Sequence, residues 1–185
     1  MKNRLFIAVD IPEGIKKYLY EIGDSLSRED KDIKKVPYHN IHITLKFLGN
    51  VNLNKIEKVK HAVKKTAENF NSFNYMIARK LSAFSSFKNA RIVFVDITVG
   101  GNKLIEICSS LEDNLSKIKI RREKRKFIPH ITIARIREKK NIEKLFRDLK
   151  LDSTGLVRCC KLTLFESKLK PGGAEYIIIE EFSLK

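Results

Sequence analysis

The chain has 185 residues, enough for one compact domain or two small lobes, and 43% of them are hydrophobic, which excludes a disordered composition. Lysine and arginine number 38 against 22 acidic residues, and the formal charge of +16 favours a polyanionic partner, with nucleic acid ahead of an anionic membrane surface. No uncharged apolar run approaches the roughly 20 residues of a membrane span, and the apolar start is too short for a signal peptide.

The basic surplus has a second interpretation, a lysine-rich bias of the whole proteome that needs no polyanion. The three cysteines are an odd number, and the adjacent Cys159 and Cys160 would point to opposite faces of a strand. We therefore expect no disulfide framework, cysteines packed in the core, and a cytoplasmic location.

Apolar runs and helical spacing predict five elements in the first half of the chain. Asp10 and Glu13 have the spacing of a capping box at the first helix, as do Asn54 and Glu57 at the second. In chain order we expect a strand at 5–9, a helix to about 26, a surface connection at 28–35, a strand at 41–48 closed by Gly49-Asn50, a helix at 54–70 and a strand at 75–84.

The second half repeats this order. We expect a strand at 92–99, a helix at 102–118, a strand at 127–136, a short helix at 141–149, a strand at 156–165 and, after Pro171-Gly172-Gly173, a final strand at 176–182. Because both halves read strand, helix, strand, helix, strand, the order indicates an internal duplication. We expect two lobes related by a pseudo-twofold axis.

One short motif occurs once in each half. His42-Ile-Thr44-Leu returns 88 positions later as His130-Ile-Thr132-Ile, each within a predicted strand. Side chains two apart on a strand share a face, so each histidine shares a face with its threonine while the apolar residues face a core. The pseudo-twofold axis would set these two faces opposite each other across a central cleft.

Two histidines on opposite sides of a cleft suit in-line displacement at phosphorus. One imidazole removes a proton from the attacking oxygen while the other protonates the leaving oxygen, and each role is typically worth about 10²–10⁴ in rate. The Thr44 and Thr132 hydroxyls can donate to the phosphate oxygens. This scheme needs neither a metal nor a cofactor. His39 and His42, three apart on an extended segment, face opposite ways and do not form a metal site.

Other candidates have two interpretations each. The segment 117–126 carries seven basic residues and one acid, and is either an RNA-backbone contact at the cleft rim or a solvated loop. Strict alternation aims Arg135 away from the histidine face. The same rule assigns Phe47 and Phe127 to core packing, although either ring could stack on a base. His61 lies on the flank of a helical stripe and is expected at the surface.

Four stretches together resemble a known family: Arg4-Leu-Phe-Ile-Ala-Val-Asp-Ile-Pro12, His42-Ile-Thr-Leu-Lys-Phe-Leu-Gly49, Pro129-His-Ile-Thr-Ile-Ala-Arg135 and Leu169-Lys-Pro-Gly-Gly-Ala-Glu-Tyr176. The chain is similar to two-histidine (2H) phosphoesterases, and most to the RNA 2′,3′-cyclic phosphodiesterases, also called LigT-like proteins or 2′-5′ RNA ligases. The resemblance implies an α+β fold with two mostly antiparallel sheets and flanking helices, in one bilobal domain over residues 1–185.

The resemblance also implies an activity and its residues. Members open a terminal 2′,3′-cyclic phosphate of RNA to a 2′-phosphate, with His42 as proton donor to the leaving 3′-oxygen and His130 as proton acceptor from water. Thr44 and Thr132 would hold the phosphate. The residues alone assign neither role, because the two motifs are nearly identical.

Two alternatives remain open. One is a 2′-5′ RNA ligase that joins RNA ends without ATP, and the other is a non-catalytic module that binds RNA ends. For all three we expect an RNA or oligonucleotide partner, no membrane partner, no cofactor and a monomer.

Overall fold

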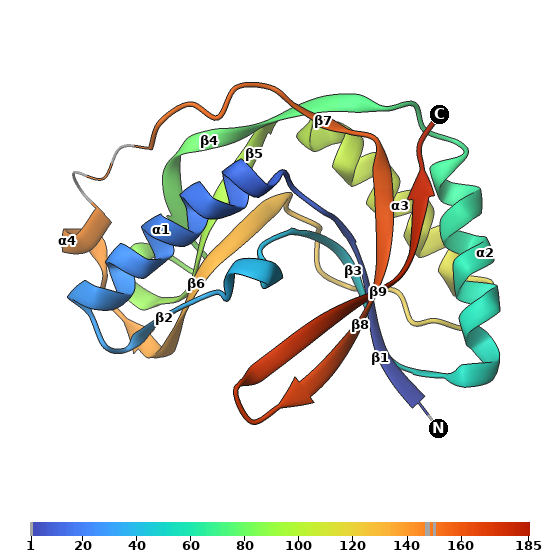
Figure 1. Cartoon of the computed structure of the whole chain (residues 1–185), viewed down its shortest axis with the longest axis horizontal. Coiled ribbons are helices and arrows are strands. Elements are labelled where there is room, and N and C mark those ends of the chain that lie inside the picture. Colours follow the sequence, from blue (N-terminus) through green and yellow to red (C-terminus); the bar gives the residue numbers. More distant parts are fainter. Residues whose placement is uncertain (1, 147–148, 150) are drawn as a thin grey trace.

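The computed structural model describes residues 2–146, 149 and 151–185 and contains two antiparallel sheets (Figure 1). The first sheet has the order β3-β1-β8-β9 and the second the order β2-β6-β5-β4-β7. The strands are β1 (Lys2–Val9), β2 (Ile33–Lys35), β3 (Ile43–Asn52), β4 (Phe73–Ala83), β5 (Ala90–Val99), β6 (His130–Lys140), β7 (Val157–Cys159), β8 (Lys161–Lys170) and β9 (Gly173–Ser183). The helices are α1 (Glu13–Glu29), α2 (Ile56–Ala67), α3 (Gly101–Ser116) and α4 (Glu143–Phe146). The predicted α+β fold is confirmed.

The two halves of the chain exchange one strand each, β4 for β8. In the first sheet β1 lies between β3 and β8, and in the second β5 lies between β6 and β4. The trios β3-β1-β8 and β6-β5-β4 therefore match strand for strand, as the predicted duplication requires. However, β4 belongs to the first half of the sequence and β8 to the second, so each lobe is built from both halves.

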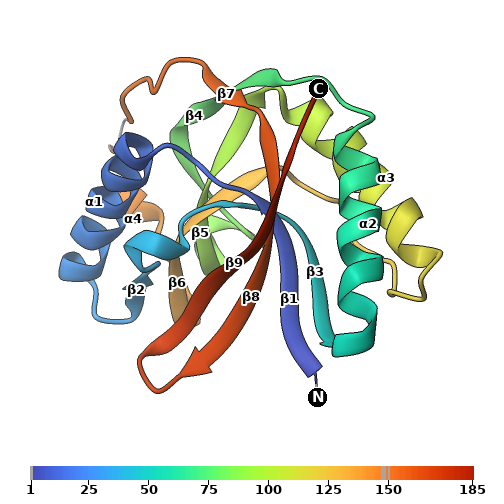
Figure 2. The ribbon, with the colours of Figure 1, turned by 45° about the vertical axis from the view of Figure 1, so that its right-hand side comes forward.

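The helices cover the outer faces of the sheets. Helix α1 packs on β2 and β6 of the second sheet, while α2 and α3 pack on each other beside the first (Figure 2). Apolar residues at helical spacing make each contact, with Leu19 and Leu26 of α1 buried. One continuous apolar cluster runs through both sheets, which gives the two lobes a shared core.

Several predicted boundaries are wrong. Residues 28–35 include the end of α1 and the edge strand β2, which pairs with β6. Gly49-Asn50 does not close the first motif strand, because Gly49 takes a φ of +68° at an irregularity and β3 continues to Asn52. The strand expected at 156–165 breaks at Cys160, where the chain passes from β7 in the second sheet to β8 in the first. Residues 147 and 148 of the helix expected at 141–149 lie outside the described residues.

The two capping boxes are also wrong. Neither α1 nor α2 has a side-chain cap hydrogen bond. Asp10 and Glu13 instead both pair with the buried Lys16, at 2.9 and 3.0 Å. Of the cysteines, Cys108 and Cys159 are buried as expected, but Cys160 is exposed. No helix among the described residues is long and apolar enough to cross a membrane.

The turn into α3 generates a stability prediction. Gly100 has a φ of +73°, and a Cβ there would overlap the Asn74 carbonyl oxygen and the backbone of Tyr75. Gly100→Ala should therefore lower the free energy of unfolding by about 3 kcal/mol in urea titrations. Gly14→Ala is the matched control, because its Cβ would meet nothing within 4 Å in the first turn of α1. The control should be neutral or slightly stabilising, and an equal loss in both variants would contradict the explanation.

Candidate active site

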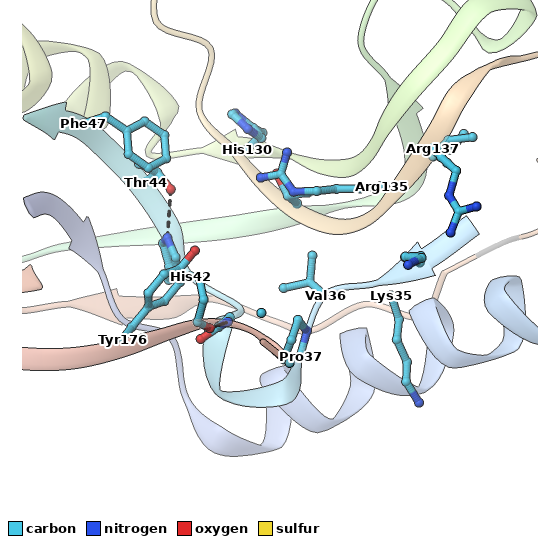
Figure 3. A pocket seen from close by; sticks show the side chains of 17 residues that line it. Lys35, Val36, Pro37, His42, Thr44, Phe47, His130, Arg135, Arg137 and Tyr176 are labelled. Carbon is cyan, nitrogen blue, oxygen red and sulfur yellow. Dashed lines mark hydrogen bonds between the residues drawn. The ribbon is translucent and has the colours of Figure 1, made fainter. Parts of the chain in front are cut away.

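The two motif faces meet at one cavity between the sheets. His42, Thr44, His130 and Thr132 all line a cavity of about 450 Å³, with His42 and His130 presented from different strands (Figure 3). His42 immediately precedes β3, and His130 is the first residue of β6. The structure thus brings together the four side chains that the repeated motif singled out.

The hydrogen bonds of the two rings differ. His130 Nδ1 lies 2.7 Å from the carbonyl oxygen of Ile128. A carbonyl can only accept, so Nδ1 carries the proton, and in the neutral ring Nε2 is left as an acceptor. His42 Nε2 instead lies 2.8 Å from Thr44 Oγ1, and the ring also bonds to the backbone of Asn40. The near-identical motifs therefore hold their histidines in different hydrogen-bonding states.

Each imidazole packs against two phenylalanine rings. His42 stacks on Phe6 of β1 and Phe165 of β8, with centroids 5.1 and 6.0 Å apart. His130 meets Phe94 of β5 and Phe84, which follows β4, edge-on at 5.2 and 4.8 Å. In both lobes one ring comes from the first strand of a repeat and the other from the exchanged strand.

This burial sets the charge of the histidines. Burial lowers the pKa of His42 from 6.5 to about 4, against the opposing effect of the Asp10 carboxylate and the backbone of Asn40. Burial also lowers the pKa of His130, opposed by its hydrogen bond to Ile128 and by Asp96. Both rings are therefore mainly neutral at pH 7 in the free protein, whereas the acid–base scheme needs one of them protonated.

Two residues that alternation assigned to the core lie in the cleft instead. In β3 the register with β1 shifts between Thr44 and Lys46, and in β6 the register with β5 shifts between Thr132 and Ala134. Each strand thus contains an extra residue at this point, a β-bulge, which reverses the faces of the side chains that follow it up to the next register shift.

The two bulges have the same consequence. Phe47 and Arg135 occupy equivalent positions after them, and both are exposed and line the cavity (Figure 3). The predicted core position of Phe47 and the outward aim of Arg135 are both wrong for this one reason. Lys46, which would otherwise face the cleft, is buried and pairs with Glu112 at 2.6 Å.

A second cavity, of about 850 Å³, adjoins the first and shares Thr44, Phe47, His130, Thr132 and Arg135 with it. The exposed segment 117–126 borders it, and Lys46 holds this segment by donating to the carbonyl of Arg121 at 3.0 Å. Arg125, Lys126 and the half-buried Phe127 line this cavity. RNA contact by the basic segment stays a prediction.

Tyr176 of β9 is a site residue that periodicity did not find. Its ring meets His42 edge-on at 5.5 Å, and it lines the first cavity beside the β8–β9 turn. Only the resemblance of the 169–176 stretch to the family pointed to it. His39 and His61 line neither cavity, and the described residues contain no group of three or more His, Cys, Asp or Glu side chains that could hold a metal.

Comparisons with known proteins assign the family. The model of the 2′-5′ RNA ligase superfamily matches residues 19–170. The chain is 30% identical to the RNA 2′,3′-cyclic phosphodiesterase of Methanothermobacter thermautotrophicus over the full length of both, and 32% identical to that of Methanocaldococcus jannaschii, covering 97% and 99% of the two chains. The protein therefore belongs to the 2′-5′ RNA ligase superfamily, the two-histidine phosphoesterases that the motifs indicated.

Solved structures agree on the fold. A protein of Thermus thermophilus, 25% identical, superposes with a TM-score of 0.82 over 98% of this chain and 97% of its own. Escherichia coli LigT in complex with NADP+, 19% identical, superposes with a TM-score of 0.79 over 100% and 98%.

The desolvation of His42 predicts its titration. Its imidazole should titrate near pH 4 in proton–carbon NMR spectra of the free protein, assigned by loss of the signal in His42→Gln. Because the pKa is lower in the folded than in the unfolded state, unfolded chains bind more protons between pH 4 and 6.5, and stability falls as pH drops through this window. His42→Gln should therefore gain stability relative to wild type as pH falls. A midpoint at or above 6.5 would contradict the burial argument.

Proposed function

We propose that this protein is an RNA 2′,3′-cyclic phosphodiesterase that hydrolyses a terminal 2′,3′-cyclic phosphate to a 2′-phosphate by metal-independent acid–base catalysis. The observation that carries the proposal is the placement of two half-buried histidines and two threonine hydroxyls around one cavity. The names of the M. thermautotrophicus and M. jannaschii relatives support the same activity.

His130 is proposed as the general base. Its Nδ1 proton is held by the Ile128 carbonyl, so Nε2 of the neutral ring can accept a proton from water. The lowered pKa keeps the ring in this neutral form at pH 7. The water oxygen then attacks phosphorus as the bond to the 3′-oxygen breaks, which leaves the phosphate on the 2′-oxygen.

His42 is proposed as the general acid that gives its proton to the leaving 3′-oxygen. Because the ring is neutral in the free protein, it must gain this proton when the substrate binds. An anionic phosphate beside the imidazole favours its charged form and raises its pKa. Thr44, now 2.8 Å from His42 Nε2, and Thr132 can donate their hydroxyl protons to the phosphate oxygens.

The central test uses an oligonucleotide that ends in a 2′,3′-cyclic phosphate, assayed in EDTA. His42→Ala and His130→Ala should each lower kcat by about 10²–10⁴, since each removes one proton transfer. His61→Ala, at an exposed position of α2, is the matched control and should keep full activity. Phosphorus NMR should show a 2′-phosphate as the product.

Other outcomes discriminate among the alternatives. Full activity in either cleft variant would reject the proposal. Binding of the phosphate end without turnover would favour the RNA-end-binding module, and joining of RNA ends without ATP would favour the ligase. The cytoplasmic location, the monomeric state and the absence of a cofactor stay predictions.

The pH dependence follows from the two pKa values. The reactive form of the free enzyme has His42 protonated and His130 neutral. The fraction of enzyme in this form falls as pH rises above the pKa of His42, and it also falls as pH drops below the pKa of His130. Both pKa values lie below 6.5, so kcat/KM should be bell-shaped with its maximum on the acid side of 6.5. The profile of kcat, which reports the complex, should shift to higher pH because the bound anion raises both pKa values. A maximum of kcat/KM at pH 7 or above would contradict this assignment.

A further inference from the structure

The cleft extends from the histidines in two directions that differ in their lining. Among the described residues, the lining of the first cavity includes no carboxylate but four basic side chains, Lys34, Lys35, Arg135 and Arg137. The second cavity is lined by the Glu112 and Glu123 carboxylates and by aromatic and aliphatic side chains, among them Phe84, Phe127, Ile92, Ile105 and Ile128. It also has basic side chains of its own, Lys46, Arg91, Arg125 and Lys126. The basic lining of the first cavity, without a carboxylate among its described residues, favours a polyanion, and the apolar side chains of the second cavity suit the flat face of a base.

Three of the basic side chains form a row on the cleft face of β2 and β6. Lys34 is the direct cross-strand partner of Arg135, and Arg137 lies two positions further along the same strand. Residues two apart share a face at a separation of about 6.8 Å, which is comparable to the distance between neighbouring phosphates of an extended nucleic acid strand. The bulge in β6 turns Arg135 and Arg137 toward the cleft, as their exposure and their place in the cavity lining show.

The fourth basic side chain does not join this row. Lys35 turns toward α1, where its ammonium pairs with Asp24 and lies 4.5 Å above the ring of Tyr20 (Figure 3). In contrast, the part of the chain that the structure describes places no carboxylate within 4.0 Å of Lys34, Arg135 or Arg137 in an ion pair. The row is therefore open to an external anion.

We propose that Lys34 and Arg137, continuing from Arg135, bind the phosphodiester groups on the 5′ side of the terminal cyclic phosphate. This inference rests on the proposed function. The cyclic phosphate occupies both the 2′- and the 3′-oxygen of the last ribose, so the strand can continue only through the 5′-oxygen. The RNA then leaves the site along β2 and β6, and the terminal base turns toward the second cavity. These contacts favour an oligonucleotide over a mononucleotide as the substrate.

The basic segment 117–126 is a weaker candidate for the same role. Arg122 pairs with Asp113 at 2.6 Å, and Glu123 lies in the lining of the cavity that the segment borders. Its positive charge is thus partly balanced by carboxylates. The row on β2 and β6 has no such balance among the described residues.

The test compares two substrates in two charge-reversed double variants. In Lys34→Glu/Arg137→Glu, kcat/KM for a hexanucleotide ending in a 2′,3′-cyclic phosphate should fall at least 10-fold, while that for a 2′,3′-cyclic mononucleotide should stay within about twofold. The slope of log kcat/KM for the hexanucleotide against log salt should flatten by about 1.4, since two single-strand phosphate contacts are lost. Lys58→Glu/Lys65→Glu, at exposed positions of α2, makes the same change of net charge and should affect neither substrate selectively.

The outcomes separate this inference from the proposed function. Wild-type protein that turns over neither substrate would overturn the proposed function. The row would then be judged by fluorescence anisotropy with a single-stranded RNA carrying a 3′-phosphate, which the Lys34→Glu/Arg137→Glu variant should bind at least 10-fold more weakly. Equal losses on both substrates, no loss at all, or a selective loss in Arg125→Glu/Lys126→Glu instead would overturn the inference.

Discussion

Burial of two imidazoles against aromatic rings is the constraint on which the site depends. Phe6 and Phe165 remove His42 from water, and this desolvation lowers its pKa from 6.5 to about 4. The two rings come from β1 and β8, strands that are far apart in sequence and meet only because the two halves exchange β4 and β8. The exchange thus completes the apolar surface under each histidine. Because this surface lowers the histidine pKa values, an anionic ligand can change the protonation of the site.

A nearly symmetric frame supports an asymmetric site. Both histidines bond to the backbone two residues upstream, at Asn40 and Ile128, and both rest on phenylalanine. Only His42 has its Nε2 beside a threonine hydroxyl, and only its pKa is lowered as far as about 4. Acid–base catalysis needs two groups that differ in proton affinity, and small differences in burial and hydrogen bonding provide them. The residue types of the repeated motif could not distinguish the two roles, because the difference lies in burial and hydrogen-bond geometry and not in residue type.

The sequence predicted the order of elements and the four side chains at the centre of the cleft, because a His-x-Thr pair precedes the bulge and follows simple alternation. It did not predict the faces of Phe47 and Arg135, which follow the bulge. In β3 a regular strand would have placed Lys46 in the cleft and Phe47 in the core. Both placements are ordinary for these residue types, so there was no sign of the bulge in the sequence. In β6 regular alternation would have placed Arg135 in the core. Burial of an arginine without a partner in the core costs free energy, and this cost was the one sign in the sequence that β6 does not alternate regularly. Strand exchange, a pairing between distant segments, left no local pattern to read.

The paired bulges also explain how a duplicated scaffold acquires direction. At the same backbone position, immediately after the extra residue, one repeat carries Phe47 and the other Arg135. The first presents an apolar ring and the second a cation, and both reach the boundary that the two cavities share. Beyond Arg135 the same face continues into Lys34 and Arg137, which extend a basic lining into the first cavity. Two copies of one backbone geometry thus give a cleft with two chemically different ends. A difference in side chains at equivalent positions, such as Phe47 and Arg135, is enough to orient an RNA strand across the cleft.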